Sequence, residues 1–307
     1  MVNITASLVK DLRDKTGAGM MDCKTALTET SGDIEVAIDW LRKKGLAKAA
    51  KKAGRTAADG LIGIITQAGR GAAVEVNSET DFVALGSDFQ GFVRKAAKRA
   101  LAEEGDLERL LAGPMEGETS VVDVLAGLIA KIGENMTLRR SAALSVSPGI
   151  VASYVHKAVA PGLGKIGVLV ALESSADGEK LAPLGKQLAM HIAAASPHAL
   201  DVASLDPQTV ERERAIYAEQ ARASGRPENV IEKMIEGRMR KFYEESVLTS
   251  QVFVIDGKTP VAKVLENASK ELGAPVKIAG FVRFAVGEGI EKPQDDFVAE
   301  VRSISGG

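Results

Sequence analysis

The chain has 307 residues, of which 26% are charged and 45% are hydrophobic, so we expect a folded protein of two or three units and exclude a disordered or fibrous one. Its formal net charge of −2 and its 4% aromatic content argue against binding nucleic acid, which needs local positive charge and often stacking rings. A single cysteine, Cys23, and the lack of an apolar run near the roughly 20 residues of a membrane helix predict a cytoplasmic protein without a membrane span.

The N-terminal region is expected to form three short helices. Apolar residues recur at helical spacing from Leu8, and a glycine-rich break separates them from a helix over 23–30 that Asp22 is expected to cap. A third helix begins at Ile34. This pattern predicts a small helical domain with its linker over residues 1–55.

Two features of this helical region have alternative interpretations. The methionine pair Met20 and Met21 either fills the core or forms an adaptable binding surface, because methionine is flexible and polarizable. The basic, alanine-rich run at 42–55 is interpreted as a solvated linker helix. A nucleic-acid patch is the alternative, although no aromatic residue interrupts the run.

A two-residue periodicity marks the next unit. The alternation of Val74 and Val76 with Glu75 and Asn77 predicts a strand with one buried face. The order strand, strand, helix, helix, strand is expected over residues 56–148. The predicted elements are strands 61–66 and 72–76, helices 88–103 and 120–133, and a strand over 137–146.

A similar order recurs in residues 149–286, which predicts two related halves of an α+β core. The second set comprises strands 150–159 and 166–173, helices 181–195 and 260–272, and a strand over 276–286. Between its helices, residues 206–246 predict two charged helices whose narrow apolar seams form an antiparallel coiled coil that projects from the body. The seam residues are Val210, Tyr217 and Ala221 on the first helix, and Ile231, Ile235, Arg238 and Phe242 on the second.

The chain offers no readable catalytic motif. Gly162, Gly164 and Gly167 match the spacing of a dinucleotide-binding loop, but they lead into a predicted strand, whereas that loop must open a helix. The histidines are too dispersed to suggest metal ligation; His191 is interpreted as a core residue, and the ring of His156 is expected to reach the surface. With no nucleophile paired to a base, we predict no covalent catalysis and no cofactor or metal site.

Polar and aromatic residues follow the predicted strand at 72–76. Thr80 or Asp81 is a candidate helix cap, because a short side-chain oxygen can accept a hydrogen bond from an unpaired backbone N–H. Phe82 either folds back onto the core or faces a partner. The residues alone favour the core, since an isolated phenylalanine is usually buried.

Several long segments occur together in one order along the chain. They are residues 8–13, 16–24, 48–54, 57–60, 75–77, 80–84, 131–135, 166–170, 236–239 and 286–291. With these segments the chain resembles the bacterial elongation factor Ts family over essentially its whole length. The resemblance implies a guanine-nucleotide exchange factor whose partner is the GTPase elongation factor Tu.

The resemblance also implies an architecture. Residues 1–55 would form a domain like a ubiquitin-associated module, and residues 206–246 would form a coiled-coil hairpin inserted in the second core half. Residues 287–307 would form a short C-terminal helical module. One departure is that the connection from His156 to Lys165 is a few residues longer than the family's usual one.

Residue roles follow from the same resemblance. Thr80, Asp81, Phe82 and Val83 match the loop that enters the partner's GTPase domain and disturbs its Mg²⁺ site. Lys10, Arg13, Met20 and Met21 match a surface that grips a helix of that domain, and His156 matches a core contact. The alternative function is a non-catalytic binding protein or chaperone-like scaffold that uses the N-terminal helices.

Overall fold

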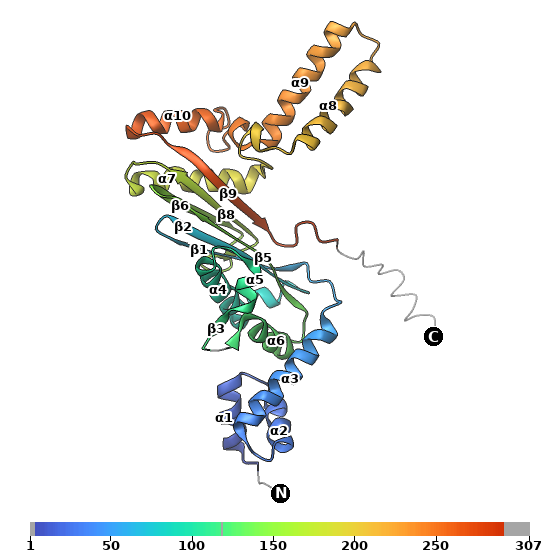
Figure 1. Ribbon diagram of the computed structural model, residues 1–307, viewed down its shortest axis with the longest axis vertical. Helices are drawn as coiled ribbons and strands as arrows, with labels where there is room; N and C mark the ends of the chain where they lie inside the picture. Colours follow the sequence, from blue (N-terminus) through green and yellow to red (C-terminus); the bar gives the residue numbers. More distant parts are fainter. Residues whose placement is uncertain (1–3, 118, 292–307) are drawn as a thin grey trace.

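A computed structural model describes residues 4–117 and 119–291 of the chain. It combines helices with antiparallel sheets, which confirms the predicted mixture of α and β structure. Figure 1 shows an elongated molecule, with the N-terminal helices at one end and a helical hairpin at the other. Most of the expected C-terminal module, residues 292–307, lies outside the described residues.

The N-terminal helices are α1 (Ala6–Thr16), α2 (Met20–Glu29) and α3 (Ile34–Lys52). They share a small apolar core formed by Val9, Leu12, Cys23, Ala26, Leu27 and Ala37. The expected cap at Asp22 is wrong, because α2 begins at Met20, directly after Gly19 and three residues before the predicted start of the helix. Asp22 instead accepts hydrogen bonds from Lys44 at 3.1 Å and Lys48 at 2.9 Å. The Lys48 and Lys44 ammonium groups hold the pKa of this carboxyl below its usual value.

The basic run is the second half of α3 and is not a separate, fully solvated linker helix. Gly45 is buried against α6 (Val121–Ile132), where an added Cβ would be in van der Waals contact with the Cβ of Ala130, at 3.9 Å. Arg42 forms an ion pair with Asp123 of α6. The run therefore joins the N-terminal helices to the body of the protein.

The first sheet has the strand order β5-β2-β1-β7, with every pair antiparallel. Its strands are β1 (Asp59–Gln67), β2 (Arg70–Ser78), β5 (Met136–Ser145) and β7 (Leu163–Gly164). Helices α4 (Ser87–Ala102) and α6 pack on one face of it. Sequence analysis missed the short elements α5 (Leu107–Ala112), β3 (Pro114–Glu116), β4 (Thr119–Ser120) and β7.

The second sheet has the antiparallel order β6-β8-β9. Its strands are β6 (Gly149–His156), β8 (Ile166–Glu173) and β9 (Lys277–Ala285), and its outer face packs against α7 (Gly178–Ala195) and α10 (Val261–Leu272). Strand β6 ends three residues before the predicted 159, because Lys157 adopts a positive φ of 49° and turns the chain towards β7.

The two sheets pack face to face, so the layers run helix, sheet, sheet, helix (Figure 1). The apolar layer between the sheets contains Ile62, Ala73, Val151, Leu169, Ala171 and Phe284. Alternate residues of the same strands, such as Leu61 and Val74, face α4 and α6 instead. Both faces of β2 are therefore buried, and the expectation of a single buried face was wrong.

The glycines at 162–167 bring the two sheets close together. A Cβ at Gly167 would lie 2.5 Å from Cγ2 of Ile62 on the opposing sheet, and Gly162 has a φ of +74° before β7. The segment leads into strand β8, as the sequence predicts, and not into a helix.

The hairpin consists of α8 (Pro207–Arg222) and α9 (Glu228–Ser246), which pack side by side. Ala221 and Ile231 lie in the predicted seam, but Arg238 is exposed and the neighbouring Met239 is buried. The Arg238 guanidinium lies over the Tyr217 ring at 5.7 Å, so it bridges the two helices from outside. The base of the hairpin has a separate small cluster formed by Ala199, Leu205, Val210, Phe242, Tyr243 and Val247.

Deleting residues 211–240 and joining the ends with a short glycine linker is expected to leave both sheets folded. The deleted part contributes no side chain to the sheet cores, and the retained Phe242 and Tyr243 still cover the base cluster. The far-ultraviolet circular dichroism and the thermal unfolding of the variant test this expectation. A broad, non-cooperative transition would show that the hairpin is needed by the sheets.

Candidate functional site

The candidate site is the loop that leaves β2. This strand carries apolar side chains on both faces up to Val76, and its last residue, Ser78, is fully buried. Three residues later the chain reaches the surface: Asp81 is exposed and Phe82 is 79% exposed. We call Asp81 and Phe82 the loop tip. The favoured burial of Phe82 in the core is therefore wrong, and the partner-facing alternative fits its position.

Hydrogen bonds fix the loop on its β2 side. Both carboxylate oxygens of Glu134 are used: Thr80 donates its backbone N–H at 3.0 Å and its hydroxyl at 2.7 Å. The next residue, Asn135, donates its backbone N–H to Glu79 at 2.5 Å. Ser78 also donates its hydroxyl to the Thr80 carbonyl at 2.9 Å. Neighbouring residues of the loop are thus held by neighbouring residues after α6.

Packing fixes the loop on its other side. Val83 and Ala84 are buried in the core beneath the first sheet and form the short 3₁₀ turn η1 (Val83–Leu85). The amide of Gln90 donates to the Ala84 carbonyl at 3.0 Å. Neither Thr80 nor Asp81 caps this turn or α4, so that expectation was wrong: Thr80 is committed to Glu134, and α4 follows Gly86 without a side-chain cap.

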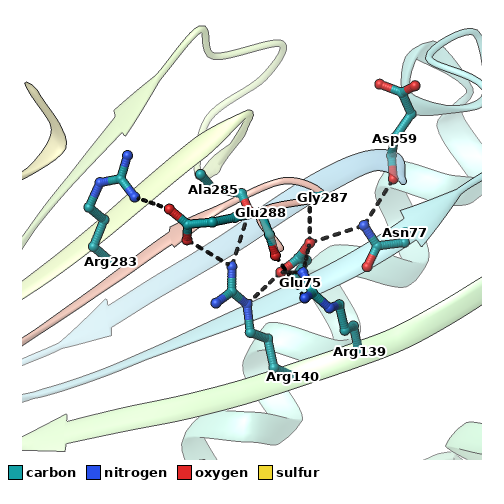
Figure 2. Close-up of polar contacts among 9 residues, drawn as sticks. All are labelled: Asp59, Glu75, Asn77, Arg139, Arg140, Arg283, Ala285, Gly287 and Glu288. Atoms are coloured by element: carbon teal, nitrogen blue, oxygen red, sulfur yellow. Dashed lines mark hydrogen bonds and ion pairs between the residues drawn. The ribbon is translucent and has the colours of Figure 1, made fainter. Parts of the chain in front are cut away.

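A buried ionic network supports the strand behind the loop (Figure 2). Glu75 has no exposed surface, yet its carboxylate is fully surrounded by donors. They are Arg140 Nε at 2.5 Å, the Gly287 backbone N–H at 2.8 Å, Asn77 Nδ2 at 3.0 Å and Arg139 Nη1 at 3.2 Å. Because a charge can be buried only when it is paired and hydrogen-bonded, this arrangement makes the polar face of β2 part of the interior.

A β-bulge makes this network possible. Successive residues of a regular strand point to opposite faces, so Arg139 and Arg140 could not both reach one carboxylate. The register of β2 against β5 pairs Glu75 with Arg140 and Val76 with Leu138, and leaves Arg139 as the extra residue. Both arginines then meet Glu75, and both also bind Glu288 in the turn after β9. Sequence reasoning missed this network, although two adjacent arginines inside a strand pattern were a usable signal.

The predicted grip residues lie on the N-terminal helices. Met20 is 50% exposed and Met21 is 72% exposed at the start of α2, which rules out core filling as their main role. Lys10 and Arg13 are exposed on α1 at a spacing of three residues, so they lie on one face of that helix. All four side chains are available to a partner.

The histidines differ as predicted. His191 is buried; the Gln251 side chain contacts its Nε2 at 2.9 Å and the Val254 N–H donates to its Nδ1 at 3.2 Å. Burial lowers the pKa of His191, and the Gln251 contact only partly opposes this shift. His156 is exposed at the end of β6, where the Tyr154 hydroxyl lies 3.2 Å from its Nδ1. The structure therefore places the loop after β2, the grip residues on α1 and α2, and His156 at the end of β6.

Within 4–117 and 119–291, the structure contains no group of three or more histidine, cysteine, aspartate or glutamate side chains that could hold a metal ion. Among the helices formed by the same residues, none is both long enough and apolar enough to cross a membrane.

Comparison with known proteins agrees with the resemblance. Residues 79–288 match the family model described as Elongation factor TS. The chain is 61% identical over 307 residues to the Elongation factor Ts of Rhodospirillum centenum, with both chains covered completely. It is 62% identical over 304 residues to that of Rhodospirillum rubrum, covering 98% of each chain, and 58% identical over 306 residues to that of Brucella anthropi, covering all of both.

The fold and the site define a mixed α and β protein that presents an exposed aromatic loop on a firmly held base. The sequence comparisons identify the family within that class. The chain belongs to the elongation factor Ts family.

Proposed function

We propose that this chain is a guanine-nucleotide exchange factor for elongation factor Tu, and that it acts without covalent chemistry. The shared name of its relatives, a translation elongation factor, supports a role in protein synthesis. The observation that carries the mechanism is the 79% exposed Phe82 on a loop held at both ends. In this mechanism Asp81 and Phe82 intrude near the Mg²⁺ and nucleotide site of the partner, release GDP and allow GTP to bind.

Linkage explains how binding alone would release the nucleotide. GDP is retained by a GTPase through contacts to its phosphates and Mg²⁺. A protein that binds the nucleotide-free partner more tightly weakens GDP binding by the same factor by which GDP weakens its own binding. The loop tip needs only to favour the state in which the Mg²⁺ contacts are lost.

The other surfaces have supporting roles in this proposal. Lys10, Arg13, Met20 and Met21 hold the GTPase domain, and His156 contacts the partner from the core. The domain division at 1–55, 56–148, 149–286 and 287–307, the ubiquitin-associated-like module, the coiled coil at 206–246 and the cytoplasmic location stay predictions, as does the absence of direct nucleic-acid contacts.

Release of fluorescent GDP from elongation factor Tu tests the function. An exchange factor added at a tenth of the partner's concentration accelerates the release of all the bound GDP, because each molecule acts repeatedly. A binding scaffold, the alternative function, would at most affect a stoichiometric fraction. Release that is unchanged by the protein at any concentration would contradict the proposal.

Replacing Met20 and Met21 with alanine is expected to weaken the complex by roughly 1 to 3 kcal/mol, as for truncated anchors of an interface. The release rate at saturating protein should change little, because the loop is untouched. Titration of the release rate against protein concentration separates the two quantities. An unchanged affinity would show that Met20 and Met21 are not anchors of the interface.

A further inference from the structure

We infer that Glu134 is a positioning residue for nucleotide exchange, which it serves by holding Thr80 and so fixing the direction of the loop tip. The inference rests on the proposed function. Glu134 and Asn135, which we call the loop clamp, come from a part of the chain more than 50 residues after the loop that they hold. Glu134 itself is half-buried and both of its oxygens bind Thr80, so its effect on a partner would pass through Thr80.

The loop tip cannot hold its own conformation. Phe82 gains little from packing because most of its side chain is exposed, and Asp81 is exposed beside it. Fixing the backbone of each mobile residue costs about 1–2 kcal/mol of conformational entropy, and a loop that is ordered before binding avoids that cost when it binds. The order must therefore come from the residues on either side of the tip.

Among the side chains that hold the residues next to the loop tip, Glu134 makes the strongest contact. A carboxylate is acceptor-only, and both of its oxygens meet donors of the same residue, the N–H and the hydroxyl of Thr80. Two bonds to one residue fix its orientation as well as its position, and bonds to an ionised group are stronger than neutral ones. Thr80 is the residue directly before the tip, so a change in its orientation redirects Asp81 and Phe82.

The clamp is itself held in place. Helix α6 ends at Ile132, and its cap residue Gly133 has a φ of 90° that turns the chain before Glu134, which meets the loop after β2. Lys52 at the end of α3 donates to the Gly133 carbonyl, and Asn135 Nδ2 donates to the Arg55 carbonyl at 2.7 Å. The clamp therefore rests on the segment that joins the N-terminal helices to the core, which gives it a rigid base.

The test measures two quantities for each variant. They are the maximum rate of fluorescent-GDP release and the protein concentration that gives half of this maximum rate. Glu134→Ala is expected to lower the maximum rate about tenfold, the equivalent of about 1.4 kcal/mol and within the cost of ordering one residue. The half-saturating concentration should change less than about twofold, because the grip residues are intact. Glu134→Gln keeps one acceptor oxygen and should recover part of the rate. Glu271→Ala, which removes an exposed carboxylate from α10, is the matched control and should leave both quantities unchanged.

Amide hydrogen exchange supplies a second readout, in which Glu134→Ala should increase exchange at residues 80–82 with little change in the strands. Should Glu134→Ala fold poorly, Thr80→Val, which removes only the hydroxyl bond, should still lower the maximum rate by about threefold. A normal maximum rate for Glu134→Ala, or a loss no larger than its unfolded fraction, would overturn the positioning role while leaving the proposed function intact. If the wild-type protein itself fails to accelerate release, both the function and this inference are wrong.

Discussion

Replacing Glu75 with alanine is expected to lower the free energy of unfolding by about 3 kcal/mol. The carboxylate is fully buried, and its loss leaves the adjacent Arg139 and Arg140 of β5 without their shared counter-charge. The Gly287 N–H would lose its acceptor as well. Removing one partner of a buried ionic cluster costs far more than the cluster contributes as a whole, because the remaining charges stay desolvated. Urea unfolding measures the change.

Glu288→Ala is the control within the same network. Glu288 also accepts from arginines, Arg283 at 2.7 Å and Arg140 at 3.4 Å, but almost half of its side chain is exposed. Water can take the place of the lost carboxylate on its exposed side, although the Arg283 side chain is only 15% exposed, so the expected cost is about 1 kcal/mol, well below that of Glu75. Equal losses for the two variants would show that burial of Glu75 is not what makes the network important.

The position of Glu75 also shows where sequence reasoning stops. The alternation of Val74 and Val76 with Glu75 and Asn77 correctly predicts the strand, because the period belongs to the strand alone. It cannot predict that a second sheet, formed by residues 149–285, covers the polar face. The bulge that admits Arg139 is likewise a property of the pairing with β5 and not of either strand.

The candidate site shows the same division between local and long-range information. A polar turn after β2 is readable from the residues, but the partner of Thr80 lies 54 positions away, so a helix cap was the best local assignment and was wrong. The residues alone favour a buried Phe82, because phenylalanine is usually buried, and only the family resemblance predicts an exposed one. The hairpin seam was predicted to contain Arg238, but the neighbouring Met239 is the buried residue. Such an error of one residue arises because a narrow apolar stripe on a charged helix does not determine which side chains point to the partner helix.

Replacing Phe82 with alanine is expected to slow GDP release from the complex of GDP, elongation factor Tu and this protein roughly 30-fold. This factor corresponds to about 2 kcal/mol, the typical cost of truncating an aromatic anchor of an interface. The stability of the protein itself should fall by less than about 1 kcal/mol, since the side chain is 79% exposed and Val83 and Ala84 remain buried beside it. Release rates at saturating protein and urea unfolding, measured on one preparation, give both quantities.

Phe253→Ala makes the same chemical change where the ring is buried, in the core of the second sheet and against the ring of His191. There the cost in stability should be about 3 to 5 kcal/mol, while release per folded molecule stays normal because the loop is unaffected. The two phenylalanines thus predict opposite outcomes for one substitution: slow release with a stable protein at Phe82, and normal release with an unstable protein at Phe253. A Phe82→Ala protein that is severely destabilised, yet releases GDP normally per folded molecule, would show that the loop tip does not act on the nucleotide site.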